Sequence, residues 1–186
     1  MSHRGPNSHG VTLAADCALG NTRLAIIDLS ERGHQPMAND DSCLWITYNG
    51  ECYNADELRT QLFTRVHRNR SNTDTEVILH LYQEFGEACV DKLRGMFAFA
   101  AWDTKNHRLF LARDRIGIKP LYYAAVPEGF LFASELKALL ASGLIARKLD
   151  PAGIHAFLEL GHIPPPWTAI RGLFPLEPGH IAVWQD

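Results

Sequence analysis

The alternation of hydrophobic and polar residues predicts several short strands before the first helix. The expected strands are Val11–Ala15, Arg23–Asp28 and Leu44–Tyr48. In the third strand Leu44, Ile46 and Tyr48 share one face, and Trp45 and Thr47 share the other. Because apolar side chains occupy both faces, this strand is expected to lie between two layers.

Two helices are predicted next in the chain. Leu58, Leu62 and Val66 recur at four-residue intervals, which is typical of one helix face. After the polar loop Asn69–Thr73, the apolar positions between Val77 and Phe85 predict a second helix that ends at Gly86. A short helical segment is expected at Ala88–Leu93.

The second half of the chain predicts hairpins and two further helices. The hairpins pair Met96–Trp102 with Arg108–Ala112, and Leu121–Ala125 with Phe130–Ala133. A short helix is expected after a cap at Ser134, and another runs from Asp150-Pro151 to Gly161, before a last strand at His180–Trp184. Helices mixed with antiparallel hairpins predict an α+β fold rather than regular βαβ alternation.

Composition and charge exclude several functional classes. The 186 residues include 18 Lys plus Arg and 21 Asp plus Glu, so the net charge of -3 gives no basic surface for nucleic acid or an anionic membrane. Hydrophobic residues at 46% exclude wholesale disorder. The N-terminus has no apolar signal segment, and no run of 18 apolar residues occurs. A cytoplasmic protein is therefore expected.

Common catalytic and metal-binding motifs are missing from the sequence. It contains no phosphate-binding G-x-x-x-x-G-K-[ST] loop, no G-x-S-x-G and no H-E-x-x-H. The nine histidines lack the spacing of a zinc site, so no metal is expected. The four cysteines are expected to be reduced, mostly buried thiols: Cys17, Cys43, Cys52 and Cys89.

Seven segments together are more informative than any one of them. They are H-R-G-P at 3–6, R-L-A-I-I-D at 23–28, Y-N-G-E-C-Y-N at 48–54, T-D-T-E at 73–76, G-M-F-A-F-A at 95–100, A-R-D-R-I-G-I-K-P-L-Y-Y at 112–123 and F-A-S-E-L-K-A-L at 132–139. In order and spacing they resemble the glutaminase domain, a class II glutamine amidotransferase, of glutamine-hydrolysing asparagine synthetases. The resemblance covers essentially the whole chain, 1–186.

The resemblance implies a fold and an activity. The fold would be an N-terminal-nucleophile-type four-layer αββα sandwich, here without its first strand and helix. The activity would be hydrolysis of the glutamine side-chain amide, with the ammonia passed to a synthetase domain that amidates aspartate with ATP. The ATP loop S-G-G-x-D-S does not occur, so no cofactor is expected in this chain, and ATP and Mg would belong to the synthetase domain.

The resemblance also assigns residues to glutamine binding. They are Arg23, the backbone at Leu24, Ile26 and Ile27, the segment Asn49, Gly50 and Glu51, and Asp74. Asn49 and Gly50 would form the oxyanion hole, because a side-chain amide and a glycine N–H can both donate to a developing negative charge. Asp74 would accept the substrate ammonium, and Arg23 would hold a carboxylate.

Each assignment has a simpler alternative in the residues themselves. Asp74 stands where it could merely cap a helix, and Arg23 could be an ordinary surface or paired arginine. Asn49-Gly50 is also a common hairpin turn. These alternatives stay open at the level of sequence.

One departure from the family concerns the nucleophile. The family uses a cysteine at the mature N-terminus, and the chain begins at a motif downstream of that position, so we expect a domain truncated at both ends and inactive alone. The alternative is a non-catalytic module that binds glutamine or acts as a scaffold. The expected partners are glutamine and the synthetase domain, without nucleic acid or membrane, and homo-oligomerisation is left open.

Overall fold

The computed structural model describes residues 1–25, 28, 30–63 and 70–185, and these fall into two compact units. Unit 1 comprises residues 1–112 with 182–186, and unit 2 comprises residues 113–181. The predicted positions that lie outside the described residues include Ile26, Ile27 and Val66.

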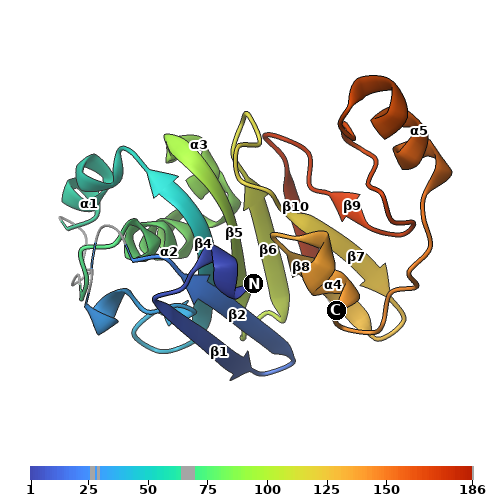
Figure 1. Ribbon diagram of the computed structural model, residues 1–186. Coiled ribbons are helices and arrows are strands. Elements are labelled where there is room, and N and C mark those ends of the chain that lie inside the picture. The colour runs from blue at the N-terminus through green and yellow to red at the C-terminus, as the bar shows by residue number, and fades with distance from the viewer. Residues whose placement is uncertain (26–27, 29, 64–69, 186) are drawn as a thin grey trace. The chain divides into compact units, whose positions relative to one another are not determined.

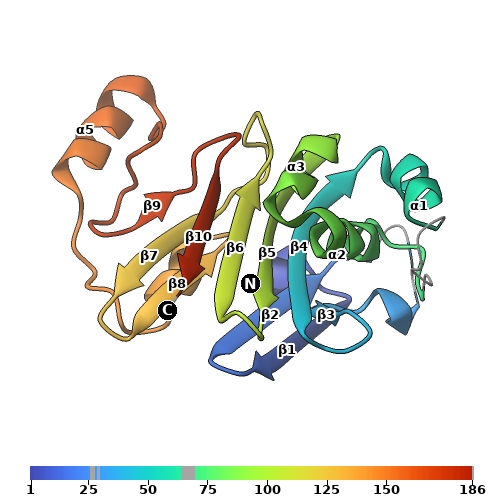
Figure 2. The same ribbon diagram turned by 180° about the vertical axis from the view of Figure 1, so that it is seen from behind.

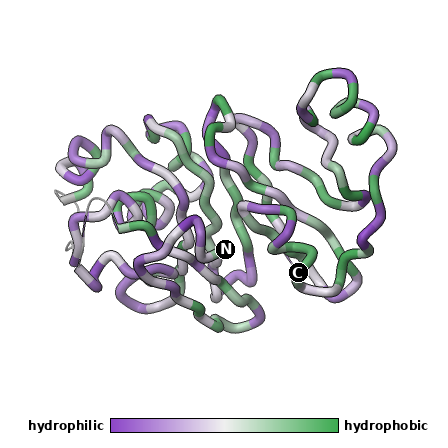
Figure 3. Tube along the Cα trace, viewed as in Figure 1, coloured by the Kyte–Doolittle hydropathy of each residue, from purple (hydrophilic) through white to green (hydrophobic). Residues whose placement is uncertain are grey.

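A sheet with the strand order β10-β6-β5-β4-β3 forms the centre of unit 1 (Figure 1). Its strands are β3 (Met37–Ala38), β4 (Leu44–Cys52), β5 (Gly95–Asp103), β6 (Arg108–Arg113) and β10 (Ile181–Gln185). Strands β4 and β5 pair antiparallel in continuous register, from Leu44 opposite Asp103 to Cys52 opposite Gly95. Figure 3 shows that β5 and β6 are hydrophobic along most of their length, as expected for central strands.

Helices cover one face of this sheet (Figure 2). They are α1 (Ala55–Phe63), α2 (Asp74–Phe85) and α3 (Cys89–Lys92), with the 3-10 turn η3 (Gly86–Ala88) between the last two. The core between helices and sheet includes Ile46, Tyr48, Ile78, Leu81 and Phe99. Even-numbered residues of β4 therefore face the helices, as their alternation predicts.

A two-stranded hairpin covers the opposite face. Strands β1 (Ser8–Ala14) and β2 (Cys17–Arg23) pair antiparallel, and the Trp102 indole N–H of β5 donates to the Ala14 carbonyl at 2.9 Å. Short 3-10 turns precede β1 and follow β2: η1 (Ser2–Arg4) and η2 (Glu31–Gly33). The prediction that β4 lies between two layers is confirmed.

Unit 2 has its own small sheet and core. The strand order is β8-β7-β9, formed by β7 (Tyr122–Val126), β8 (Gly129–Ala133) and β9 (Phe174–Pro175), with the helices α4 (Leu136–Leu140) and α5 (Pro151–Leu160). The Asp150 carboxylate accepts from the N–H groups of Ala152 and Gly153, and Gly161 ends α5 with φ +74°. The predicted start and end of α5 are confirmed.

Two sequence predictions about elements are wrong, and one short strand was not predicted. The predicted strand 23–28 is not found at its described residues 24, 25 and 28, whereas residues 26 and 27 lie outside the described residues. Residues 17–23 form the strand, because pairing with β1 overrides the weak strand propensity around Gly20-Asn21. The two-residue strand β3 was not predicted. Helix α4 begins after Glu135 with no side-chain cap, so Ser134 is not its cap. The α+β class is confirmed, and the four-layer order stays a prediction.

Candidate functional site

Asn49 and Gly50 lie inside strand β4, so the hairpin-turn alternative for this pair is wrong. Gly50 is opposite Phe97, and a Cβ on Gly50 would lie 2.3 Å from the Met96 carbonyl oxygen and 2.8 Å from the Phe97 Cα. Glycine at position 50 therefore allows a close backbone approach, and the backbone that approaches is that of β5.

Asp74 is the first residue of α2, and Thr73 is its N-cap. The Thr73 hydroxyl accepts from the Glu76 N–H at 3.3 Å, and the Glu76 carboxylate reaches back to the N–H groups of Arg70 and Ser71 at 2.8 and 2.7 Å. This arrangement is a variant of the capping box. Since Thr73 caps the helix, the alternative that Asp74 merely caps it is wrong.

The Asp74 side chain is buried and holds the edge of β4. Its Oδ2 accepts from the Tyr48 hydroxyl and from the Cys52 backbone N–H, both at 2.9 Å. Both hydrogen bonds that the described residues donate to this carboxylate are accepted by Oδ2. A ligand could therefore bind through Oδ1.

The N–H groups along the edge of β4 indicate the direction of the Gly50 N–H. The Tyr48 N–H donates to the Gln35 side chain at 2.7 Å, and the Cys52 N–H donates to Asp74. Backbone N–H groups of alternate residues in a regular strand point to the same side. The Gly50 N–H therefore points to the same edge, between the acceptors Gln35 and Asp74.

Asn49 provides a second donor next to Gly50. Its Nδ2 is buried and has no hydrogen-bond partner among the described residues. An orphaned buried donor costs roughly 1–3 kcal/mol, so a site that retains one usually has an acceptor that binds there. The Asn49 amide and the Gly50 N–H are consecutive donors on one strand.

Arg23 lies at the end of β2, close to the start of α2. Its guanidinium donates to the carbonyls of Asp28 and Ser30, the latter at 3.0 Å. A Cβ on Gly33 would lie 2.2 Å from Arg23 Nη2 and 2.8 Å from Thr73 Cγ2, so both groups lie beside Gly33. Glycine at position 33 thus allows the guanidinium to approach the residue before Asp74.

The other predicted binding residues are less well defined. The Leu24 side chain is 55% exposed, and the Glu51 side chain is exposed on β4. Ile26 and Ile27 lie outside the described residues. Of the predicted set, the structure places Asn49, Gly50 and Asp74 at one edge of the central sheet and Arg23 close to the start of α2.

Burial and charge keep two neighbours of Asp74 protonated. Burial, and after it the Asp74 carboxylate, raises the pKa of the Tyr48 hydroxyl. The same two causes raise the pKa of the Cys52 thiol to about 11. Tyr48 therefore donates to Asp74 at neutral pH, and Cys52 is a thiol rather than a thiolate.

Three side chains around Asp74 were not predicted as site residues from the sequence: Tyr48, Gln35 and Thr75. Gln35 and Thr75 are buried polar side chains that hydrogen-bond to each other at 3.1 Å. The inward alternation of Tyr48 in a strand before Asn49 could have indicated its position. No pattern in the sequence pairs Gln35 with Thr75, because 40 positions separate them.

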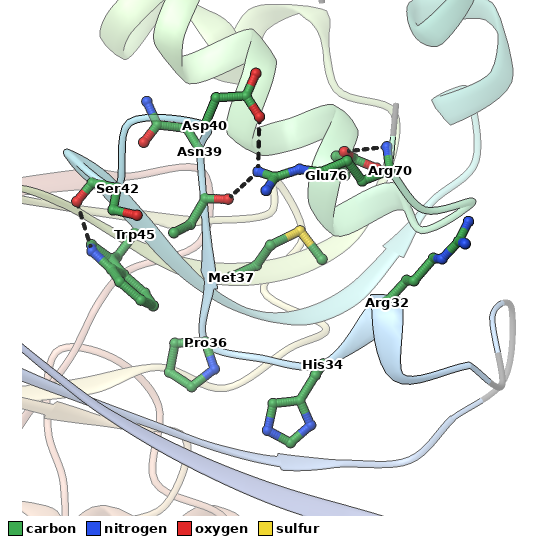
Figure 4. A pocket seen from close by; sticks show the side chains of 11 residues that line it. Arg32, His34, Pro36, Met37, Asn39, Asp40, Ser42, Trp45, Arg70 and Glu76 are labelled. Atoms are coloured by element: carbon green, nitrogen blue, oxygen red, sulfur yellow. Dashed lines mark hydrogen bonds and ion pairs between the residues drawn. The ribbon is translucent and has the colours of Figure 1, made fainter. Parts of the chain in front are cut away.

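A cavity of about 340 Å³ lies nearby, at the β3 edge, but contains none of the predicted site residues (Figure 4). Arg70 bonds to the Asp40 carboxylate at 3.2 Å and to the Ala38 carbonyl at 2.9 Å, and the Trp45 indole donates to the Ser42 carbonyl at 3.0 Å. None of the eleven residues that line the cavity belongs to the predicted set. The cavity is therefore not the predicted glutamine site.

Comparison with known proteins decides the family. A family model described as a glutamine amidotransferase domain matches residues 1–186. The chain belongs to this family. Its class is that of the class II glutamine amidotransferases, as its sequence motifs predicted.

Curated relatives of this glutamine amidotransferase domain are named as asparagine synthetases. Asparagine synthetase [glutamine-hydrolyzing] 3 of Bacillus subtilis is 43% identical over 188 positions, which covers 100% of this chain and 30% of the relative. Putative asparagine synthetase [glutamine-hydrolyzing] 2 of Methanocaldococcus jannaschii is 38% identical and is covered to 38% of its length. The chain thus spans about a third of each relative.

Solved structures agree on the fold. The glutamine phosphoribosylpyrophosphate amidotransferase of Bacillus subtilis superposes with a TM-score of 0.59 at 20% sequence identity. The superposition covers 90% of this amidotransferase domain and 34% of that chain. At this level of identity the likeness supports the shared α+β fold alone.

The four cysteines of this amidotransferase domain are free thiols. Cys52 and Cys89 are buried, as expected, whereas Cys17 and Cys43 are half-buried. Burial raises the pKa of Cys17 to about 11 and of Cys89 to about 12. Cys17, Cys52 and Cys89 therefore lack the environment of a reactive thiolate.

The described residues offer neither a metal cluster nor a membrane-spanning helix. No three His, Cys, Asp or Glu side chains in the described ranges gather closely enough to hold a metal ion. None of the helices described is long and apolar enough to cross a membrane.

Proposed function

We propose that this chain binds glutamine and stabilises the oxyanion that forms when the glutamine side-chain amide is hydrolysed. The observation that carries the proposal is the buried Asn49 amide, without an acceptor among the described residues, next to the Gly50 N–H at the strand edge that Asp74 also occupies. Two adjacent donors suit one developing negative charge. Asp74 suits the ammonium group at the other end of the same substrate.

Each group would have a distinct task in the reaction. As a nucleophile attacks the amide carbon, the carbonyl oxygen becomes negative and is stabilised by the Asn49 Nδ2 and the Gly50 N–H, at about 3–4 kcal/mol for one such donor. The C–N bond then breaks, and the substrate nitrogen takes the proton that the nucleophile gives up and leaves as ammonia, after which water hydrolyses the acyl intermediate to glutamate and frees the nucleophile. Asp74 holds the α-ammonium throughout, so its contribution is to binding rather than to the change in charge.

Arg23 is proposed to hold the substrate α-carboxylate. Its guanidinium has five N–H donors, and the carbonyls of Asp28 and Ser30 use part of them. The remaining donors can bind a carboxylate beside the start of α2. The backbone at Leu24, Ile26 and Ile27 and the Glu51 segment are proposed to complete the pocket.

The nucleophile is proposed to be a residue other than the four cysteines described above. Cys17, Cys52 and Cys89 have raised pKa values. Cys43 immediately precedes β4 and lies six residues before Asn49, which in extended chain separates them by about 20 Å. Because none of these four cysteines suits the role of nucleophile, a second candidate function is also favoured, in which residues 1–186 alone bind glutamine without hydrolysing it.

The relatives suggest the larger reaction. We propose that a protein containing this domain passes the ammonia to an ATP-dependent amidation of aspartate in an adjoining synthetase domain, where ATP and Mg would bind. We also propose the four-layer αββα arrangement for the complete domain. The family match and the 43% identity to an asparagine synthetase support both proposals.

Calorimetric titration tests the proposed binding site. L-Glutamine should bind, whereas glutaramate, which is glutamine without the α-amino group, should bind more weakly because it cannot pair with Asp74. Asparagine, shorter by one methylene, serves as a matched control and should bind weakly. If glutamine and asparagine bind equally, or if neither binds, the proposed site is wrong.

An ammonia assay separates the two candidate functions. The chain alone should bind glutamine but release no ammonia above the uncatalysed rate. Turnover that is abolished by alkylation of one of the four cysteines would show that this cysteine is the nucleophile and would overturn our assignment.

A further inference from the structure

Gln35 links three elements around the proposed site through one buried side chain. Its Oε1 accepts from the Tyr48 N–H of β4 at 2.7 Å and from the Asn21 amide of β2 at 3.2 Å. Its Nε2 donates to the Thr75 hydroxyl of α2 at 3.1 Å. Only 8% of Gln35 is exposed, so water competes weakly for these bonds.

These partners lie next to the proposed binding residues in the chain. Tyr48 immediately precedes Asn49 and Gly50, and Thr75 immediately follows Asp74. A single amide group therefore connects the strand that carries the oxyanion donors to the helix that carries the carboxylate. A change in this connection would alter the distance between the two ends of a bound substrate.

Gln35 also takes the place of a neighbouring strand. Strand β3 pairs with β4 only at Ile46 and Trp45. Beyond that point, the edge N–H of Tyr48 is bound by Gln35 and that of Cys52 by Asp74. These two side chains bind the edge on either side of Gly50 and leave the Gly50 N–H to a ligand.

The β2 end of the network reinforces the same strand. The Asn21 amide donates to the Thr47 hydroxyl at 3.1 Å as well as to Gln35, and the Thr47 hydroxyl donates to the Gly20 carbonyl at 3.3 Å. The hairpin and the helix thus hold β4 from opposite faces, and Gln35 contacts both. Its removal would loosen β4 on both faces.

We propose that Gln35 is a positioning residue of the glutamine site, acting through Tyr48 and Thr75 without touching the substrate. This inference rests on the proposed function. It assigns to Gln35 the spacing between the oxyanion donors and Asp74. Loss of Gln35 should therefore weaken glutamine binding and displace the oxyanion donors, beyond any loss of folding stability.

The test compares variants of Gln35 and Thr75 in the same chain. Gln35→Met keeps the side-chain length but removes all three bonds, and should weaken glutamine binding about 5- to 20-fold in calorimetric titration. Thr75→Val removes only the bond to α2 and should weaken binding less. The double variant should bind like Gln35→Met, because Thr75 has no Gln35 amide left to lose.

A conservative replacement should restore the site. Gln35→Glu keeps an oxygen that accepts from Tyr48 and Asn21, and the Thr75 hydroxyl can donate to its second oxygen. It should therefore recover most of the affinity that Gln35→Met loses. If Gln35→Met does not fold, Thr75→Val and Gln35→Glu still test the proposal.

A matched control separates positioning from stability. Asn39 is another buried amide, whose Oδ1 accepts from the Leu44 N–H at 3.0 Å at the far end of β4. Asn39→Ala should lower the melting temperature without changing glutamine affinity. If Gln35→Met lowers affinity no more than Asn39→Ala at equal loss of melting temperature, Gln35 is merely structural and the proposal is overturned.

A spectroscopic measurement without ligand keeps this test independent of the proposed function. In ¹H–¹⁵N spectra of the free chain, Gln35→Met should shift the Gly50 backbone amide and the Asn49 side-chain amide, and Asn39→Ala should leave both in place. Unshifted signals in Gln35→Met would overturn the positioning role. Shifted signals in a wild-type chain that does not bind glutamine would refute only the proposed function.

Discussion

Replacement of Asp74 by asparagine removes one negative charge at the start of α2 and keeps the shape of the side chain. The asparagine carbonyl oxygen can occupy the position of Oδ2, where it still accepts from the Tyr48 hydroxyl and the Cys52 N–H. Thr73, which caps α2, is unchanged. We therefore expect a small effect on the melting temperature.

The expected effect on glutamine binding is much larger. With the asparagine oxygen at the Oδ2 position, its NH2 group replaces Oδ1 and cannot accept from the substrate ammonium, so the charge-assisted bond is lost, at roughly 1.5–3 kcal/mol. This loss corresponds to a dissociation constant about 10- to 150-fold higher. Glutaramate has no ammonium group, so its affinity should be almost the same for the wild type and Asp74→Asn.

Calorimetric titration of both ligands against both proteins measures this difference directly. Asp150→Asn serves as the matched control, because it removes the same charge in unit 2, where asparagine caps α5 about as well as aspartate. Asp150→Asn should bind glutamine like the wild type. The decisive quantity is the ratio of glutamine affinity to glutaramate affinity, which should fall only in Asp74→Asn.

Two results would refute this reasoning. If Asp74→Asn binds glutamine as the wild type does, Asp74 does not contact the ammonium. If it loses affinity for glutamine and glutaramate equally, the substitution has disturbed the pocket as a whole, and the charge of Asp74 has no specific partner in the ligand.

Three further predictions concern catalysis, packing and pH. Asn49→Ala should lower kcat for glutamine hydrolysis in the complete enzyme by roughly 10²–10³ with KM and melting temperature nearly unchanged, and a change in KM alone would contradict this. Gly50→Ala should cost about 1–3 kcal/mol in urea unfolding, because its Cβ would meet β5 at 2.3 Å, whereas Gly20→Ala, with its nearest atom at 3.9 Å, should be tolerated. Burial raises the pKa of Glu76, but the His80 ring at 3.7 Å and hydrogen bonds from Arg70 and Ser71 outweigh it and lower the pKa to about 2, so roughly 3 kcal/mol of stability should be present above pH 4.5 and lost as pH falls through 2. Glu76→Gln should flatten this dependence in unfolding curves, and an equally steep curve would argue against it.

Local patterns in the sequence determined several elements correctly. The alternation of apolar residues in 44–48 predicted a strand between two layers, and Asp150-Pro151 and Gly161 predicted both ends of α5. These signals are local, because strand alternation and helix capping depend on residues a few positions apart. The motifs that carry the family resemblance were also complete in the sequence.

The tertiary structure decided the conformation and partners of the site residues. Asn49-Gly50 has the composition of a turn, and its pairing with β5 makes it strand. Asp74 could have been a cap until its bonds to Tyr48 and Cys52, more than 20 positions away, showed that it binds the edge of β4. The Gln35 network likewise joins residues up to 40 positions apart. Such contacts form only when the sheet and α2 pack together, because a buried polar group binds whichever partner the fold brings within reach.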